Sequence, residues 1–279
     1  MRPVPTCTLS SADDPRAVDG HDLDRYVQIG SLTKPLTATV LTRLAEAGEL
    51  QLDYPIEQFL PAPPGTGITL RHLAAHTSGL PRLPPNLRRR DPYAPFDAEA
   101  LDTLVRRLDT LPTAAPGHAE EYSNLGYALL GAALVSATGT SYEDLLARHV
   151  LAPLGITEIS ASPPPPLRLH RPGLFGRPVR PWTMNGAILP AGGLWATPRA
   201  AARLVVALLV ERKLGEPTPF WQTAGPLRWH NGATRLASVF TGALPDGTWV
   251  LIHRLSGNAE QTDALGIAHL QKIAASKAG

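Results

Sequence analysis

A serine and a lysine lie three residues apart in the segment Gly30–Lys34, which reads GSLTK. On a helix, Ser31 and Lys34 would share one face, with about 5–6 Å between their Cβ atoms. An amine this close can accept the hydroxyl proton once burial and nearby positive charge lower the pKa of the amine. The pair is therefore a candidate nucleophile with its activating base. A helix-capping serine followed by a solvated lysine has the same spacing.

A second group of polar residues is Tyr122-Ser123-Asn124, which begins another helical pattern. A tyrosine beside a lysine ammonium can carry a lowered pKa and move a proton to and from a serine hydroxyl. The Asn124 amide can donate to a substrate carbonyl and help hold Lys34. A core tyrosine at a helix start gives the same sequence, so this pattern alone leaves both readings open.

A third group, His230-Asn231-Gly232-Ala233, enters a β-rich tail. A strand edge with glycine at its third position lets a carbonyl substrate lie against the backbone. The N–H of Ala233 could then pair with the N–H of Ser31 as an oxyanion hole. His230 would supply a polar group near the substrate, although an ordinary turn histidine fits the same residues.

The three motifs S-x-x-K, Y-S-N and H-N-G, in this order, resemble the active site of the serine β-lactamase and penicillin-binding-protein superfamily. The Tyr-x-Asn motif is typical of the branch that holds class C β-lactamases, D-alanyl-D-alanine carboxypeptidases and related esterases. The resemblance covers most of residues 26–265. It extends to four further stretches, which are HLAAHTSGLP (His72–Pro81), PGHAEEYSNLGYALLGAAL (Pro116–Leu134), SYEDLLARHVLAPLGI (Ser141–Ile156) and PAGGLWATP (Pro190–Pro198).

The resemblance implies a role for each matching residue. Ser31 would be the acylated nucleophile and Lys34 its activating partner. Tyr122 would be the general base of acylation and the proton donor to the leaving group, and His230 would take a place often filled by lysine. The substrate-binding positions would be Asn124, Asn231, Gly232 and Ala233. This scheme needs no metal and no organic cofactor.

The order of helical and β-rich segments predicts an α/β (α+β) fold, β-lactamase-like by the resemblance, in which an antiparallel sheet is flanked by helices and carries an inserted all-α lobe. We expect one domain over residues 1–279, with an α/β lobe at about 1–60 and 190–279 and a helical lobe at about 61–189. Only 30 residues precede Ser31. The resemblance therefore implies either an abbreviated N-terminal part of the sheet or an incomplete chain start.

Two positions of the third motif depart from the resembled pattern, because Ala233 and Arg235 stand where glycine is common. Arg235 could narrow the pocket, anchor a carboxylate or point to solvent. A third departure is Ala200, which stands where the pattern often has an acidic residue.

The composition narrows the class of protein further. The 279 residues are 43% hydrophobic and carry a net charge of +2, which fits a globular chain and does not indicate nucleic-acid binding. Cys7 is the only cysteine, so no disulfide framework or cysteine-rich metal site is expected. The sequence contains no apolar run of membrane-spanning length and no recognisable signal peptide at its start, which predicts a cytoplasmic protein without membrane contacts. The arginines Arg82, Arg88, Arg89 and Arg90 lie among prolines and indicate a solvated loop.

Competing interpretations are weaker. His72 and His76 have the i, i+4 spacing of zinc ligands, but the glutamate of H-E-x-x-H and a third ligand are missing. The nucleophile elbow G-x-S-x-G of α/β-hydrolases is absent from the sequence. We expect an enzyme acting on small esters or amides, including β-lactams. A D-amino-acid peptidase or acyltransferase of the same fold, and a non-catalytic ligand sensor, are the alternatives.

Overall fold

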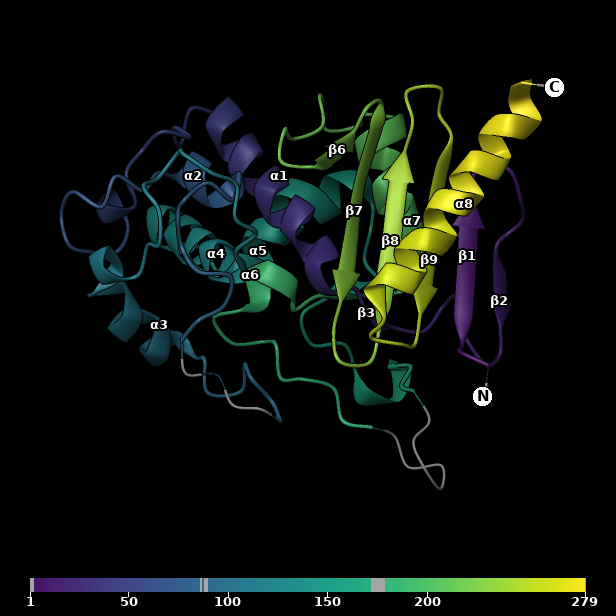
Figure 1. Cartoon of the computed structure of the whole chain (residues 1–279), viewed down its shortest axis with the longest axis horizontal. Coiled ribbons are helices and arrows are strands. Elements are labelled where there is room, and N and C mark those ends of the chain that lie inside the picture. Colours follow the sequence, from purple (N-terminus) through teal and green to yellow (C-terminus); the bar gives the residue numbers. More distant parts are fainter. Residues whose placement is uncertain (1–2, 86, 88–89, 172–178, 279) are drawn as a thin grey trace. The chain divides into compact units, whose positions relative to one another are not determined.

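A computed structural model describes residues 3–85, 87, 90–171 and 179–278 of the chain. Its internal contacts divide the chain into two compact units. The sheet unit comprises Met1–Leu32, Leu151–Pro181 and Leu194–Gly279, and the helical unit comprises Thr33–Val150 and Trp182–Gly193. The mixed α/β architecture with antiparallel sheets confirms the fold class expected from the sequence (Figure 1).

The sheet unit is built on a six-stranded antiparallel sheet with the strand order β2-β1-β9-β8-β7-β6. Strand β1 places the N-terminal segment beside β9, with Cys7 opposite His253. The strands β7, β8 and β9 form consecutive hairpins, in which Gly232 lies opposite Val239 and Val239 opposite His253. The strand bounds are Thr6–Ser10 (β1), Arg16–Val18 (β2), Gln222–Ala224 (β6), Leu227–Ala233 (β7), Ser238–Ala243 (β8) and Trp249–Arg254 (β9).

A second, three-stranded sheet in the same unit has the order β3-β5-β4. Its strands are short: Val27–Gln28 (β3), Ile159–Ser160 (β4) and Trp195–Ala196 (β5). Strand β3 leads directly into a 3₁₀ turn, η1 (Gly30–Leu32), so this sheet fixes the approach of the chain to Ser31.

Two helices pack against the large sheet, α7 (Pro198–Val205) and α8 (Ala259–Ala278). Figure 1 shows α8 crossing one face of the sheet diagonally while α7 lies behind it. On the α8 face, Phe240, Val250, Ile252 and Leu270 form a buried apolar cluster. Gly266 allows close packing there, because a Cβ at this position would lie 2.0 Å from Cδ1 of Phe240. A threonine followed by a proline, Thr197-Pro198, predicts a helix start, and α7 begins there and continues through a π-helical turn, Val206–Val210.

The helical unit consists of packed helices around α1, whose residues 33–41 are all buried. Helix α4 packs on α6, and Gly131 makes the contact possible because a Cβ there would lie 2.1 Å from Cγ of Pro190. The bounds are Thr33–Glu46 (α1), Leu70–Ala74 (α2), Ala98–Val105 (α3), Asn124–Thr138 (α4), Tyr142–Leu146 (α5) and Leu189–Gly192 (α6).

The local sequence predicts helix caps at Asp97 and Ser141 and a helix from near Asn124 that ends at Gly139, and the structure confirms these helix ends. The side chains of Asp97, Ser123 and Ser141 each accept a hydrogen bond from a backbone N–H in the first turn of the helix that follows. Gly139 ends α4 in the left-handed conformation, with φ at 65°. These features depend on neighbours in the chain, which is why the sequence indicates them directly.

The observed units differ from the expected lobes in two long segments and at residues 190–193, which lie in the helical unit. The sequence interpretation assigned residues 33–60 to the α/β lobe, whereas α1 lies in the helical unit because it packs on α4, α5 and α6. Residues 151–181, expected in the helical lobe, lie in the sheet unit because β4 pairs with β5. The expectation of one domain over the whole chain stays a prediction.

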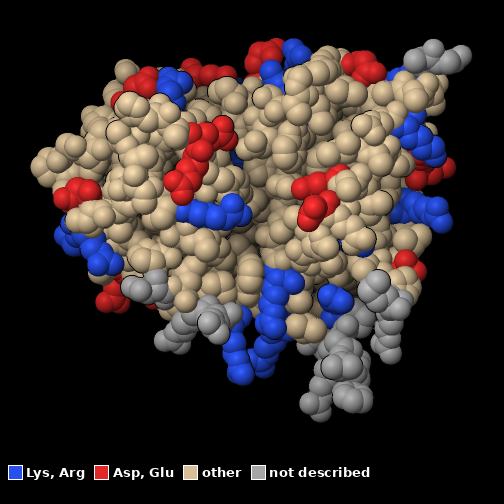
Figure 2. Space-filling view, viewed as in Figure 1, with Lys and Arg blue, Asp and Glu red and all other residues tan. Residues whose placement is uncertain are grey.

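The surface carries both signs of charge on a mainly uncharged background, as Figure 2 shows for one face. Arg82 and Arg90 are exposed, and the predicted loop positions Arg88 and Arg89 lie outside the described residues. Residues 160–185 contain Pro163–Pro166 and little periodicity, which predicts a long surface loop, and residues 172–178 of this segment also lie outside the described residues. None of the helices in the described part of the chain combines the length and apolar character that a membrane crossing requires.

Two buried histidines join β9 to the segment that precedes Ser31. His253 donates from Nε2 to the Gln28 carbonyl at 3.0 Å, since a carbonyl can only accept. Nδ1 of His253 then accepts from Nε2 of His21 at 2.9 Å, and Nδ1 of His21 accepts from the Asp22 N–H at 2.8 Å. Nδ1 of His21 also lies 3.1 Å from the Asp22 carbonyl. Burial lowers the pKa of His21 to about 4 and that of His253 to about 3.

The buried histidine pair predicts a loss of stability in acid. Below about pH 6.5 the unfolded chain binds protons at both imidazoles while the folded chain does not, so each group costs about 1.4 kcal/mol per pH unit until its folded pKa is reached. Urea denaturation should show that the free energy of unfolding decreases as the pH is lowered from 7 to 5. The variant His21→Gln/His253→Gln should show a shallower fall, and the exposed His118→Gln should match the wild type. Equal slopes in all three proteins would contradict this origin.

Candidate active site

The amine of Lys34 is a buried, hydrogen-bonded group of the helical unit. Lys34 lies in the first turn of α1, and its residue is 0% exposed. Its Nζ donates to Oδ1 of Asn124 at 2.7 Å and to the carbonyl of Ala191 at 2.6 Å. Burial lowers the pKa of Lys34 well below its usual value, and the positive charge of Arg82 acts in the same direction. Two acceptors from different helices therefore fix the position of this buried amine.

Tyr122 lies next to this amine, two residues before α4. Its ring centroid is 4.7 Å from Nζ of Lys34 and 5.0 Å from Cζ of Arg82. Asn124, the first residue of α4, donates from Nδ2 to the Tyr93 hydroxyl at 3.2 Å, which fixes its carbonyl oxygen toward Lys34. The structure thus brings together Lys34, Tyr122 and Asn124, three of the residues predicted from the sequence.

The segment 76–82 holds the Tyr122 region in place through a series of backbone hydrogen bonds. The two segments are far apart in the sequence: Ser123 donates its backbone N–H to the side chain of His76, which lies 47 residues earlier. Four carbonyls of residues 76–82 accept from backbone N–H groups of residues 113–124: His76 from Glu121 at 2.7 Å, Thr77 from Gly117 at 2.7 Å, Gly79 from Thr113 at 2.8 Å and Arg82 from Asn124 at 2.8 Å. Gly79 has φ at 71°, and a Cβ on it would lie 2.0 Å from the Ala114 carbonyl oxygen. The HTSGLPR sequence is therefore a support for the tyrosine motif.

In the sheet unit, Ser31 lies in η1 against strand β7. The contact is backbone on backbone: a Cβ on Gly232 would lie 2.1 Å from the Ile29 carbonyl oxygen and 2.9 Å from the Ser31 amide nitrogen. A Cβ on Gly30, whose φ is 50°, would lie 2.8 Å from the amide nitrogen of Ala233. Only glycine at these two positions lets the Ser31 segment and the third motif approach so closely.

The strand register shows where the amide of Ala233 points. Thr234 donates its N–H to the Ala237 carbonyl at 2.8 Å, which makes this pair hydrogen-bonded across the hairpin. Such pairs alternate along an antiparallel ladder, so the next pair, Ala233 with Ser238, is not hydrogen-bonded. The N–H of Ala233 therefore points away from β8, toward the side on which Gly30 lies. Strand β6 covers only residues 227–229 of that edge.

The side chains of the third motif face opposite sides of the sheet. His230 is buried and shares its face with Gly232, which is the face against η1. Its Nδ1 donates to the Asn231 carbonyl at 2.6 Å, so a neutral ring carries its proton on Nδ1. Asn231 points to the α8 side, where Nδ2 donates to Asp263 at 2.7 Å. Burial raises the pKa of Asp263.

Several supporting residues were not foreseen from the sequence. Gln28 connects the approach to Ser31 with the end of the third motif, because its Oε1 accepts from the Thr234 hydroxyl at 3.0 Å. Tyr93 and Arg82 contact the second motif from the loop between α2 and α3. The one sequence signal for such supporting residues was the HLAAHTSGLP stretch. Its own residues do not show which segment it contacts in the folded protein.

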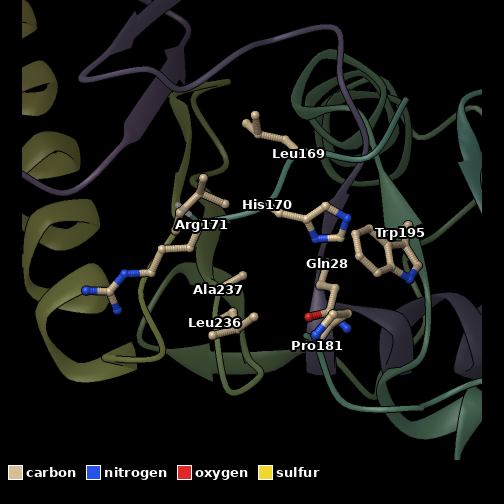
Figure 3. A pocket seen from close by; sticks show the side chains of 9 residues that line it. Gln28, Leu169, His170, Arg171, Pro181, Trp195, Leu236 and Ala237 are labelled. Atoms are coloured by element: carbon tan, nitrogen blue, oxygen red, sulfur yellow. The ribbon is translucent and has the colours of Figure 1, made fainter. Parts of the chain in front are cut away.

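Two cavities of the sheet unit contain none of the eight predicted site residues. One, of about 10 Å³, has room for a single water molecule (Figure 3). Figure 3 shows Gln28, His170 and Trp195 among the side chains at its edge. The other, of about 390 Å³, lies beside α7, β1 and β9. Its lining includes Leu9, Ala202 and Trp249.

The two histidines considered as zinc ligands each have Nδ1 hydrogen-bonded to a backbone N–H group. His72 accepts from Thr69 N–H at 3.3 Å within a helix cap, and His76 accepts from Ser123 N–H at 3.1 Å. Within the described ranges, no three His, Cys, Asp or Glu side chains gather in a way that could hold a metal ion. The polar groups of the site are instead donors and acceptors suited to proton transfer.

Comparison with known proteins identifies the family. The beta-lactamase family model matches residues 8–264, and the chain therefore belongs to the beta-lactamase family. It is 35% identical to the D-alanyl-D-alanine-carboxypeptidase/endopeptidase AmpH of Escherichia coli (strain K12) over 188 residues, which are 63% of this chain and 47% of that protein. It is 32% identical to the esterase EstB of Burkholderia gladioli over 189 residues, which are 60% and 46% of the two chains. The chain thus matches less than half the length of these curated relatives.

Solved structures agree on the fold. A beta-lactamase/D-alanine carboxypeptidase from Yersinia pestis, complexed with citrate, superposes with a TM-score of 0.79 at 20% identity, covering 97% of this chain and 92% of that one. A class C beta lactamase from Rhodobacter sphaeroides gives a TM-score of 0.71 at 16% identity, with 96% and 93% covered. The resemblance proposed from the three motifs is confirmed at the level of family and fold.

Gly79 offers a test of the support beneath the tyrosine motif. In Gly79→Ala the new Cβ meets the Ala114 carbonyl and the left-handed φ is strained, so the free energy of unfolding should fall by about 2–5 kcal/mol. Gly139→Ala is the matched control, because Gly139 has φ at 65° and open space around a Cβ. That variant should lose about 1 kcal/mol. Chemical denaturation of both proteins measures the difference, and equal losses would mean that the 79–114 contact is not required.

Proposed function

We propose that this chain is a serine hydrolase that forms a covalent acyl-enzyme on Ser31 and acts on small esters or amides, β-lactams included. The observation that carries the proposal is the buried Lys34 amine, which is hydrogen-bonded to Asn124 and lies 4.7 Å from the Tyr122 ring. A solvated lysine would need none of these contacts. A lysine with a lowered pKa, three residues after a serine, is suited to activate that serine.

The reaction begins with loss of the Ser31 hydroxyl proton to the base formed by Tyr122 and Lys34. The Ser31 oxygen forms a bond to the substrate carbonyl carbon, and the negative charge moves to the carbonyl oxygen. The N–H groups of Ser31 and Ala233 stabilise this oxyanion. The bond to the leaving group then breaks, and Tyr122 returns the proton to the leaving oxygen or nitrogen. Water attacks the acyl-enzyme by the same path in reverse and releases the acid.

The remaining predicted residues bind and orient in this proposal. Asn124 holds Lys34 and offers its amide to the substrate. Gly232 and Ala233 provide the strand edge along which the substrate carbonyl lies, and His230 stands on the face of β7 that meets the Ser31 segment. Asn231 contributes through its backbone, since its side chain amide is bonded to Asp263.

Two alternatives have support of their own. Similarity to AmpH, named a D-alanyl-D-alanine carboxypeptidase/endopeptidase, favours D-amino-acid peptides as substrates or an acyl transfer between them. Similarity to proteins named only as penicillin-binding, such as penicillin-binding protein 4* of Bacillus subtilis, favours a sensor that binds the ligand without turnover. Chromogenic esters, a chromogenic cephalosporin and a D-alanyl-D-alanine peptide, assayed side by side, separate these readings. The cytoplasmic location stays a prediction that cell fractionation tests.

Ser31 is the residue on which the covalent step depends. Incubation of the wild-type protein with a β-lactam or an activated ester should add the acyl mass to the tryptic peptide that contains Ser31. Ser31→Ala should abolish both the adduct and turnover while leaving the thermal midpoint nearly unchanged, because the hydroxyl is half-buried outside the apolar core. Turnover without an adduct, or a Ser31→Ala protein with the wild-type rate, would refute the acyl-enzyme.

Tyr122→Phe tests the proton-transfer step while keeping the ring. Removal of a general acid–base group slows the reaction by about 10²–10⁴-fold, and we expect acylation to fall within this range. Stopped-flow measurement of the acylation burst records the change. A normal burst in Tyr122→Phe would assign the base to Lys34 alone and remove Tyr122 from the mechanism.

A further inference from the structure

His76 is a buried residue of the helical unit that the proposed reaction does not use. It follows α2, is 4% exposed and adopts a left-handed backbone with φ at 60°. Residues other than glycine avoid this conformation at a cost of about 1–2 kcal/mol. The backbone of His76 therefore has a strained conformation that asparagine or glycine would adopt more easily.

His76 contacts the chain on both sides of Tyr122. Its carbonyl accepts from the Glu121 N–H at 2.7 Å, and its Nδ1 accepts from the Ser123 N–H at 3.1 Å. Between these two bonds, its ring packs on the Tyr122 ring with centroids 4.5 Å apart and planes inclined by 34°. The other aromatic neighbour is Tyr127, at 5.1 Å, whose hydroxyl is bonded to the Ala74 carbonyl.

These contacts fix the backbone and the side chain of Tyr122 together. The hydrogen bonds to residues 121 and 123 restrain the peptide groups that flank it. The ring contact restrains its side-chain rotation, since a ring packed at this distance cannot turn without displacing its neighbour. The left-handed backbone of His76 is what directs its carbonyl and its ring to the same short segment.

We propose that His76 is a positioning residue for Tyr122, which holds the phenol in the geometry needed for proton transfer. The inference rests on the proposed function, in which Tyr122 moves protons to and from Ser31 and the leaving group. His76 touches neither substrate nor reacting atoms and acts through Tyr122 alone. A displacement of a catalytic group by about 1 Å can cost about 10²-fold in rate, which sets the scale of the effect.

The variant His76→Asn tests this role. Asparagine tolerates a positive φ and keeps the carbonyl bond to Glu121, but removes the ring from Tyr122. We expect kcat for acylation to fall by about 10–100-fold with little change in KM. The loss should be larger for alkyl esters than for nitrophenyl esters, because a poor leaving group depends more on the proton from Tyr122. His72→Gln, which retains a residue type suited to its helix cap, is the matched control and should keep the wild-type rates.

A double-mutant cycle separates positioning from general support. If His76 acts through the phenol, His76→Asn should cost less than about 3-fold when Tyr122 is already phenylalanine. The same cost in both backgrounds, or equal losses for good and poor leaving groups, would overturn the proposal. His76→Gly, which also accepts the left-handed backbone, replaces His76→Asn if that protein does not fold. If neither folds, His76 is required for stability and the positioning role is refuted.

The failure of this inference can be told from failure of the proposed function. Absence of a Ser31 adduct in the wild-type protein overturns the acyl-enzyme and the role of His76 with it. A normal wild-type adduct, combined with additive losses in the cycle, overturns the role of His76 alone.

Discussion

The burial of one amine governs the arrangement of the helical unit. Lys34 comes from α1, its acceptor Asn124 from α4 and its acceptor Ala191 from α6. An ammonium group without water is costly, and the fold reduces this cost by lowering the pKa of the amine and by satisfying its N–H donors. Three helices therefore have to meet at one nitrogen atom. That requirement brings the tyrosine motif at the start of α4 beside the lysine.

The sheet unit depends on a constraint of another kind, which is the lack of space at two glycines. Gly30 and Gly232 let η1 and β7 touch through their backbones, where any side chain would meet main-chain atoms at 2.1–2.8 Å. The bonds from His253 to the Gln28 carbonyl and from Thr234 to the Gln28 side chain secure the same contact from the other side. The Ser31 amide is thus located by main-chain packing.

Local features of this protein could be predicted from its sequence, and long-range ones only in part. The caps at Asp97 and Ser141 depend on residues a few positions apart, so these helix starts can be predicted from the sequence. The motifs also indicated the family, because their order and spacing are specific. Nothing local shows that α1 packs on α4, α5 and α6, and the sequence alone places the whole of this helix in the other lobe. The opposite orientations of His230 and Asn231 do follow from the two-residue period of a strand, which was not applied to the motif.

The contacts around Tyr122 show why sequence patterns identify a chemical group more readily than its supports. The residue types of a proton-transfer site are few and recognisable, whereas His76 and Arg82 belong to a stretch that carries no chemistry of its own. Their effect depends on hydrogen bonds between segments about 40 residues apart.

The same distinction explains the departures from the family pattern. Ala233 contributes its backbone N–H on the Gly30 side, while its exposed side chain alternates to the α8 face with Asn231. Arg235 is exposed in the hairpin turn that follows. A substitution at either position changes the side chain and keeps the amide, so the oxyanion site proposed here does not require glycine at these two positions.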